Sequence, residues 1–426
     1  MRCALKMLGI CLTAIFLGTI ALIVVYHIPT DTIYRHLQKD RDIFQKEGNY
    51  WSWANKSPTK LDGFTDSIML MNAAYPVDSV PTSAMAVFKW HGKGSPAQTF
   101  VKALNDKNDE SLGKTSYYRY WHGYLVYLKP ILFISSYHDF RMLNAYLIFF
   151  LTTAVLILFY LRLGILHTIA FAITILFINP VTVAMSLQYS TIFYITLMSV
   201  LLILWKNDKI YKNNLYVYFF LIIGILTSYM DFLTYPVVGI GIPLLVYILL
   251  NKDSFDNKKF FCLSVIKNSC AWGFGYLTMW AGKCLAAFVV LQHSILPEVL
   301  DALKNRTSSE VSAEVLGHDP INLITVLQAN FKAAVTGPWI YIFAVFLIYL
   351  IYRMIKNRPY GIVSPPPPEM FLVSIFPFIW YSLTLNHSYV HADWLAFRDL
   401  AVTFFAILSI GIEMTSNQKK ENNNEQ

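Results

Sequence analysis

Long apolar segments separated by short polar ones run through most of the chain, from Met7 to Met414. An α-helix needs about 20 mostly apolar residues to cross a bilayer, and a helix satisfies all of its backbone hydrogen bonds internally. The pattern therefore predicts an all-α fold, a polytopic transmembrane helical bundle of about ten spans. The predicted spans are residues 7–26, 142–161, 164–179, 187–205, 215–230, 233–251, 268–291, 338–353, 370–385 and 399–414.

The composition supports this class of protein. Charged residues make up only 14% of the chain, whereas soluble domains contain about 25%. The net charge of +8 alone suggests a nucleic-acid partner. However, most lysines and arginines outside the first long polar segment stand just beyond apolar runs, where they orient a membrane protein and meet anionic lipid. We therefore expect membrane lipid, and no nucleic acid, among the partners.

The basic residues also predict the topology. With a cytoplasmic N-terminus, every short cytoplasmic segment contains lysine or arginine, as the positive-inside rule requires. The first apolar run is longer than the core of a signal peptide and precedes no small-residue cleavage site, so we expect it to be an uncleaved helix. The prediction is one integral domain of the cell membrane, residues 1–426, with a cytoplasmic tail at 415–426 and large extracytoplasmic loops at 27–141 and 292–337.

Two acids stand early in the first loop, within Leu61-Asp-Gly-Phe-Thr-Asp-Ser. A structural interpretation makes Asp62 a turn residue and Thr65 or Asp66 a helix N-cap. The catalytic alternative makes Asp66 a general base. A carboxylate that is partly desolvated near lipid has a raised pKa, closer to the range useful for accepting a hydroxyl proton.

A second group of ionisable residues lies in one short outer connection between predicted spans. His387 and His391 are four residues apart, so on a helix they share one face, and Asp393 and Arg398 follow. They are candidates for substrate binding, with hydrogen bonding to lipid headgroups as the structural alternative. A metal site at the histidines is possible in principle, but no HExxH pattern accompanies them.

Single charges mark other outer helix ends. Asp231 ends one predicted helix just before the next begins, and Lys283 stands inside an apolar stretch. Ionisable groups within a membrane are costly and are functional candidates by default. Lys283 either reaches the interface along its aliphatic stem or binds a lipid-linked phosphate, a role also open to Arg306 and Arg398.

An aromatic segment, Tyr118-Arg-Tyr-Trp-His-Gly-Tyr, closes the first loop. Aromatic faces suit sugar rings, and Arg119 and His122 add polar contacts. An aromatic belt at the membrane interface is the competing interpretation.

The layout resembles that of the GT-C superfamily, polytopic glycosyltransferases that use polyprenyl-phosphate-linked sugars. The similarity lies in one helix, a long outer loop carrying an acid at Asp62 or Asp66, and then a bundle of mostly short-looped helices. The stretch Lys129-Pro-Ile-Leu-Phe-Ile-Ser-Ser-Tyr-His-Asp-Phe-Arg, in which Arg141 precedes the second span, also looks like the family's approach to its second helix. Many members have adjacent acids in this loop, whereas here the two stand four residues apart.

The resemblance implies transfer of a sugar from a polyprenyl-phosphate donor to a glycan, lipid or protein acceptor on the extracytoplasmic face. It implies that Asp66, or Asp62, accepts the acceptor's proton and that Lys283, Arg306 or Arg398 stabilises the phosphate. No cofactor follows from the sequence, and participation of Mg²⁺ or Mn²⁺ stays open. The alternative functions are a polysaccharide or lipid-linked-oligosaccharide transporter or flippase, and a polymerase.

Overall fold

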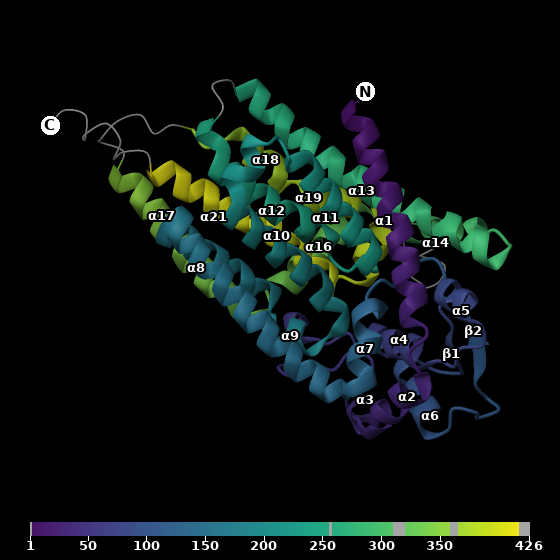
Figure 1. The fold of residues 1–426 in the computed structure, drawn as a ribbon. Coiled ribbons are helices and arrows are strands. Elements are labelled where there is room, and N and C mark those ends of the chain that lie inside the picture. Colours follow the sequence, from purple (N-terminus) through teal and green to yellow (C-terminus); the bar gives the residue numbers. More distant parts are fainter. Residues whose placement is uncertain (1, 255–257, 310–319, 358–364, 417–426) are drawn as a thin grey trace.

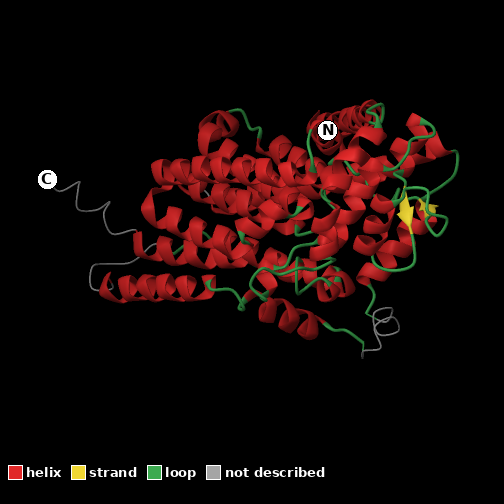
Figure 2. Ribbon diagram, turned by 90° about the horizontal axis from the view of Figure 1, so that it is seen from below, coloured by secondary structure: helices red, strands yellow, loops and turns green. Residues whose placement is uncertain are grey.

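The computed structural model describes residues 2–254, 258–309, 320–357 and 365–416. In the described residues, six helices are long and apolar enough to cross a membrane, as expected for a membrane protein. The all-α class is confirmed, because sheet structure in these residues is limited to one antiparallel pair of three-residue strands and one isolated bridge (Figure 2). The six helices span Cys3–Val25, Tyr137–Ile178, Leu187–Lys212, Pro236–Ser254, Phe261–Leu291 and Trp339–Lys356.

Each predicted span overlaps helical structure, but because six of the described helices are long and apolar enough to cross a membrane, the count of about ten spans stays a prediction. Six of the predicted spans correspond to single helices: α1 (Arg2–Val25), α10 (Leu187–Lys212), α11 (Tyr216–Met230), α12 (Pro236–Asn251), α13 (Lys258–Leu291) and α17 (Trp339–Asn357). Predicted span 370–385 is broken into α18 (Pro368–Ser374) and α19 (Phe376–Leu383), and span 399–414 begins as η4 (Ala396–Leu400) and continues as α21 (Ala401–Ser416).

The remaining two predicted spans form α8 (Tyr137–Ile178), which folds back on itself at Gly164. Gly164 has a φ of +79° and a ψ of 176°, which interrupt the helix. The rings of Phe159 and Phe171 stack with centroids 4.3 Å apart, whereas a straight helix would separate these residues by roughly 18 Å. Asn144 also donates a hydrogen bond to the Ala184 carbonyl at 2.9 Å. The helix is therefore a hairpin of two antiparallel arms.

Residues between α1 and α8 fold into a compact cap with its own buried core, seen at the lower right of Figure 1. The start of α1 and the end of α21 both lie away from this cap (Figure 1). The cap consists of α2 (Thr30–Lys39), α3 (Arg41–Glu47), η1 (Ser57–Thr59), α4 (Gly63–Ala74), α5 (Val80–Ala86), β1 (Lys89–His91), α6 (Pro96–Asn105), β2 (Gly113–Thr115) and α7 (Leu125–Ile134).

Five further short helices complete the described fold: α9 (Pro180–Met185), η2 (Lys252–Ser254), α14 (Leu296–Thr307), α16 (Leu323–Ala334) and α20 (Leu385–Val390). Of these, η2 lies at the end of α21, where Lys252 pairs with Glu413. The helical pattern predicted from Ile295 to Leu303 corresponds to α14, which begins at Leu296 with Pro297 in its first turn.

Close backbone approach joins α11 to α13. A Cβ added at Gly224 would lie 2.0 Å from the Trp272 carbonyl oxygen, and one added at Gly275 would lie 2.3 Å from that of Leu221. Small residues of this kind allow membrane helices to pack backbone against backbone. This contact fixes the position of α13, which carries much of the candidate site.

Candidate functional site

A cavity of about 360 Å³ lies between α13, α14 and α19. Its walls are mostly aliphatic and aromatic, and its polar end is formed by the segment before α7 and the last turn of α14. The lining residues are Arg119, Tyr120, Leu233, Tyr276, Leu277, Trp280, Val299, Ala302, Leu303, Arg306, Thr307, Trp380, Leu383 and Thr384.

Two arginines line the polar end of the cavity, and the sequence suggests each of them separately as a substrate-binding residue. The guanidinium carbons of Arg119 and Arg306 lie 5.8 and 5.2 Å from the centroid of the Tyr120 ring. Arg119 Nε is buried without a hydrogen-bond partner, and in the described residues neither guanidinium forms an ion pair with a carboxylate. Arg119 also hydrogen-bonds Tyr117 and lies within electrostatic range of Glu298. Two guanidinium groups without an ion-paired carboxylate in the described residues still favour an anionic ligand in the cavity.

The cavity also meets the apolar surface of the helices. Leu277 on α13, Leu303 on α14 and Leu383 on α19 are 63%, 49% and 59% exposed. Because α13 contains a candidate membrane span, a lipid bilayer would cover this surface. The cavity therefore fits an amphiphile with an anionic head and a hydrocarbon chain.

Asp231 stands directly behind the polar end. It follows α11, and its two carboxylate oxygens accept hydrogen bonds from the backbone N–H and the hydroxyl of Thr234. Burial raises the pKa of Asp231 to about 6, against the opposing effect of these hydrogen bonds. The cavity-lining rings of Tyr120 and Tyr276 lie within electrostatic range of this carboxyl.

The two predicted histidines meet the same region. The ring centroids of His387 and His391 are 4.4 Å apart, and His387 Nε2 forms a 2.7 Å hydrogen bond with the carbonyl of Leu233, which lines the cavity. Burial and the nearby charge of Arg306 lower the pKa of His391 to about 3, so this ring is neutral at pH 7. His391 Nδ1 is buried without a partner. In the described residues no three or more His, Cys, Asp or Glu side chains form a group that would hold a metal ion.

Lys283 and His122 lie beside the cavity and not in its wall. Lys283 Nζ donates to the Met85 carbonyl at 2.8 Å and so joins α13 to the end of α5. His122 Nδ1 lies 3.0 Å from the Tyr124 hydroxyl, and its ring packs 4.9 Å from that of Phe232. Both side chains already have partners within the protein.

Asp66 and Asp62 belong to a second group of ionisable residues, at the start of α4 in the cap. Asp66 accepts hydrogen bonds from the Tyr137 hydroxyl (2.7 Å), the Ser186 hydroxyl (3.2 Å) and the backbone N–H groups of Leu187 (2.9 Å) and Gln188 (3.0 Å). Its carboxylate thus occupies the N-terminus of α10, where backbone donors and the helix dipole stabilise negative charge. Burial raises the pKa of Asp66, and the hydrogen bonds from Tyr137, Gln188 and Leu187 oppose the rise.

Asp62 is the N-cap of α4, because its Oδ1 accepts the Thr65 N–H at 3.0 Å. Its Oδ2 is buried without a partner. Burial and the charge of Asp66 raise the pKa of Asp62 to about 7. Asp62, and not Thr65 or Asp66, caps this helix, and it retains the free carboxylate oxygen.

Arg398 and Asp393 connect distant segments near Asp62. Arg398 is fully buried, with its guanidinium carbon 4.2 Å from the Tyr189 ring, and it donates to the carbonyls of Ile178, Trp394 and Pro58. Asp393 pairs with Lys60 and accepts from the Ser57 hydroxyl. The structure thus places Arg398 among carbonyl groups and outside the wall of the cavity.

Gln188 joins the two groups of acids. Its backbone N–H donates to Asp66, and its side-chain amide donates to the Thr234 hydroxyl, which donates to Asp231. Sequence reasoning did not identify Gln188 or Thr234, because uncharged polar residues beside predicted helix starts give no distinctive signal. Nor did it identify the cavity aromatics Tyr276, Trp280 and Trp380, which look like ordinary interfacial residues.

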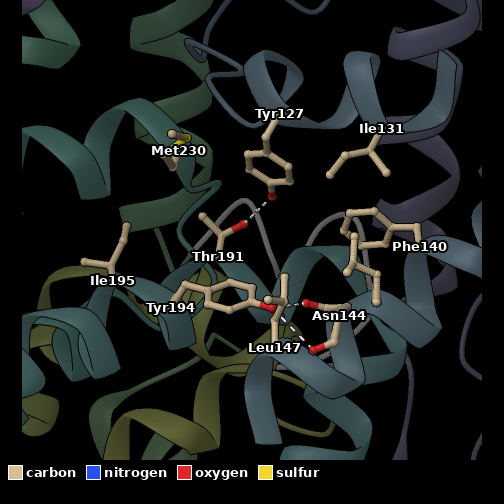
Figure 3. A pocket seen from close by; sticks show the side chains of 10 residues that line it. Tyr127, Ile131, Phe140, Asn144, Leu147, Thr191, Tyr194, Ile195 and Met230 are labelled. Atoms are coloured by element: carbon tan, nitrogen blue, oxygen red, sulfur yellow. Dashed lines mark hydrogen bonds between the residues drawn. The ribbon is translucent and has the colours of Figure 1, made fainter. Parts of the chain in front are cut away.

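A second cavity, of about 330 Å³, lies between α7, α8 and α10 (Figure 3). The polar atoms of its wall bond one another. Tyr194 donates to Asn144 Oδ1 at 2.6 Å, and the hydroxyls of Tyr127 and Thr191 are 3.4 Å apart (Figure 3). No charged side chain lines it, so it offers no binding group for a phosphate.

Comparison of the chain with protein-family models, with curated proteins and with solved structures found no match.

Proposed function

We propose that this protein is a membrane glycosyltransferase that takes a sugar from a polyprenyl-phosphate donor and transfers it to an acceptor hydroxyl on the extracytoplasmic face. The observation that carries the proposal is the cavity between α13, α14 and α19, whose wall combines two guanidinium groups that form no ion pair in the described residues with exposed leucines. This is the shape and charge distribution of a lipid phosphate.

Arg119 and Arg306 would hold the phosphate, with the polyprenyl chain leaving past Leu277, Leu303 and Leu383. In the reaction, the acceptor oxygen forms a bond to the anomeric carbon as the bond from that carbon to the phosphate oxygen breaks. The electron pair stays on the departing lipid phosphate, and the two arginines stabilise the added negative charge.

The acceptor's proton passes to a carboxylate. Asp231 lies within electrostatic range of the cavity residues Tyr120 and Tyr276, so we assign it the general-base role. Asp62, with its free oxygen, is the alternative. Asp66 is the least suited of the three, because its hydrogen bonds hold the start of α10 and none of their donors lines the cavity.

Topology is part of the proposal. About ten spans, with both termini in the cytoplasm, would put the cap and the polar end of the cavity outside. The arrangement is supported by Arg162, at the turn of the α8 hairpin, which pairs with Asp208 near the end of α10 at 3.4 Å. Asp66 in the cap holds the start of α10, and Asp208 stands near the other end of that helix, so this ion pair lies away from the cap.

Binding of a polyprenyl monophosphate to the full-length protein in detergent tests the donor site. We expect Arg119→Ala and Arg306→Ala each to weaken binding about 10- to 100-fold, because each removes charge-assisted hydrogen bonds to the phosphate. Arg35→Ala, an exposed arginine on α2, is the matched control. The uncharged polyprenol should bind weakly and respond little to any of these variants.

Equal binding of polyprenol and polyprenyl phosphate, unaffected by both arginine variants, would contradict the donor site. Transfer itself is measured in vesicles with polyprenyl-phosphate-linked sugars. Loss of the base should lower the rate by roughly 10²–10⁴-fold, so Asp231→Asn is expected to fall in that range while it still binds the polyprenyl phosphate. An unchanged transfer rate in Asp231→Asn would move the base role to Asp62.

A further inference from the structure

A row of aromatic rings leads from the surface of the cap to the cavity. Tyr50 contacts Phe64 (centroids 6.0 Å apart, planes 5° apart) and Trp394 (4.5 Å). The row continues inward from Trp394 to His391, at 5.0 Å, and from His391 to His387, at 4.4 Å.

Exposure changes along this row. Tyr50 is 36% exposed, Phe64, Trp394 and His391 are half-buried, and His387 is 6% exposed. His387 in turn hydrogen-bonds the Leu233 carbonyl, and Leu233 lines the cavity. The row is thus continuous with the proposed donor site and open to solvent at its far end.

Polar groups accompany the exposed end. The Lys60–Asp393 ion pair has side chains 29% and 52% exposed, and Asp393 is the residue before Trp394. Lipid chains would have to desolvate this pair, which is costly. A ligand with apolar C–H faces and polar edges can instead stack on the electron-rich ring faces while hydrogen-bonding the charged groups. Carbohydrates have this combination.

We infer that Tyr50 and Trp394 form a carbohydrate-binding platform that guides a glycan acceptor toward the cavity. The inference rests on the proposed function and deepens it, because it selects a glycan among glycan, lipid and protein acceptors. His391, whose buried Nδ1 has no partner, is placed to hydrogen-bond the sugar residue nearest the donor.

The platform is tested by saturation-transfer NMR and titration of the full-length protein in detergent with short soluble oligosaccharides of glucose, mannose, galactose and N-acetylglucosamine. We expect at least one to bind, and Tyr50→Ala or Trp394→Ala to weaken that binding about ten-fold through loss of ring stacking. Tyr50→Phe should retain binding. Trp205→Ala, at an exposed tryptophan on α10, should also leave it unchanged.

Three results would overturn the platform. One is the absence of binding by every oligosaccharide, and another is binding that Tyr50→Ala and Trp394→Ala leave unchanged. The third comes from a photo-crosslinking phenylalanine analogue in place of Tyr50 in vesicles: attachment to lipid chains would identify this surface as a membrane contact, and attachment only to peptide would identify it as a protein-docking surface.

The outcomes separate this inference from the proposed function. If oligosaccharide binding depends on Tyr50 and Trp394 but no lipid-phosphate-linked sugar is transferred, the platform stands and the transferase proposal fails. If transfer depends on Arg306 and Asp231 but not on Tyr50 or Trp394, the transferase stands and the glycan platform fails.

Discussion

At the scale of single residues, Asp62 and Asp66 show which features the sequence can predict and which it cannot. The motif around Asp62 and Asp66 correctly predicts a turn followed by a helix, because both features depend on neighbouring residues. The partners of Asp66 lie about 120 positions away at the start of α10, and nothing local indicates them. The same limit applies to Arg398, whose carbonyl partners come from two other segments and from Trp394 in its own turn.

Asp62 gives a pH prediction. Its pKa is about 7 in the folded protein and 3.8 as a reference, so between these values the folded state holds a proton that the unfolded state has lost. The free energy of unfolding therefore falls as pH rises from about 4 to about 7, by at most a few kcal/mol from this group. Thermal unfolding in detergent should show that Asp62→Asn loses part of this pH dependence.

Asp66 and Asp231 also have raised pKa values. The informative quantity is therefore the difference in the free energy of unfolding between the wild type and Asp62→Asn. As pH rises, the free energy of unfolding of Asp62→Asn should increase relative to that of the wild type. Parallel curves for the two proteins across this range would show that Asp62 is ionised at both ends and would contradict its raised pKa.

At the scale of elements, the apolar runs predict helices well because lipid-facing helices must be apolar along their whole length. The predicted spans 142–161 and 164–179 are the two arms of α8, and the break between them falls at Gly164 as the sequence suggested. The division of span 370–385 into α18 and α19 was not predicted. Pro377, in the first turn of α19, provides a signal for that break, since proline removes a backbone donor and fits the start of a helix.

The α8 hairpin depends on Gly164. An added Cβ at Gly164 meets nothing within 4 Å, so substitution acts through the backbone alone. We expect Gly164→Val to lower the free energy of unfolding by about 1–3 kcal/mol, because a β-branched residue is strained at a positive φ. Thermal unfolding in detergent measures this effect.

Gly273→Ala on α13 is the control, since Gly273 also has open space around it but no positive φ. A Gly164→Val variant as stable as Gly273→Ala would show that the chain can reverse here without a glycine.

At the scale of the whole molecule, the structure separates a cap from a bundle, and the positive-inside rule predicts which faces outward. A variant without native cysteines, carrying a single cysteine by Asn55→Cys, Arg162→Cys or Lys209→Cys, tests this with a membrane-impermeant maleimide in intact cells. We expect labelling at Asn55 only. The other two sites should react after permeabilisation, because they lie at the opposite end of the bundle.

Labelling of Arg162→Cys from outside would contradict both the hairpin and the orientation. Charge at helix ends yields a prediction of orientation, and the labelling experiment tests it. The cavity could not be predicted, since it needs α13, α14, α19 and the segment before α7 to meet, and no local pattern specifies those contacts.

Gln188 connects the group around Asp231 to the group around Asp66 through hydrogen bonds. The side-chain amide of Gln188 donates a hydrogen bond to Thr234, and the backbone N–H of Gln188 donates one to Asp66 at the start of α10. A ligand that displaces Thr234 would break the hydrogen bond from Gln188, which lies in the first turn of α10. Any effect of that ligand on α10 would be matched by an equal effect of α10 on the ligand's binding free energy.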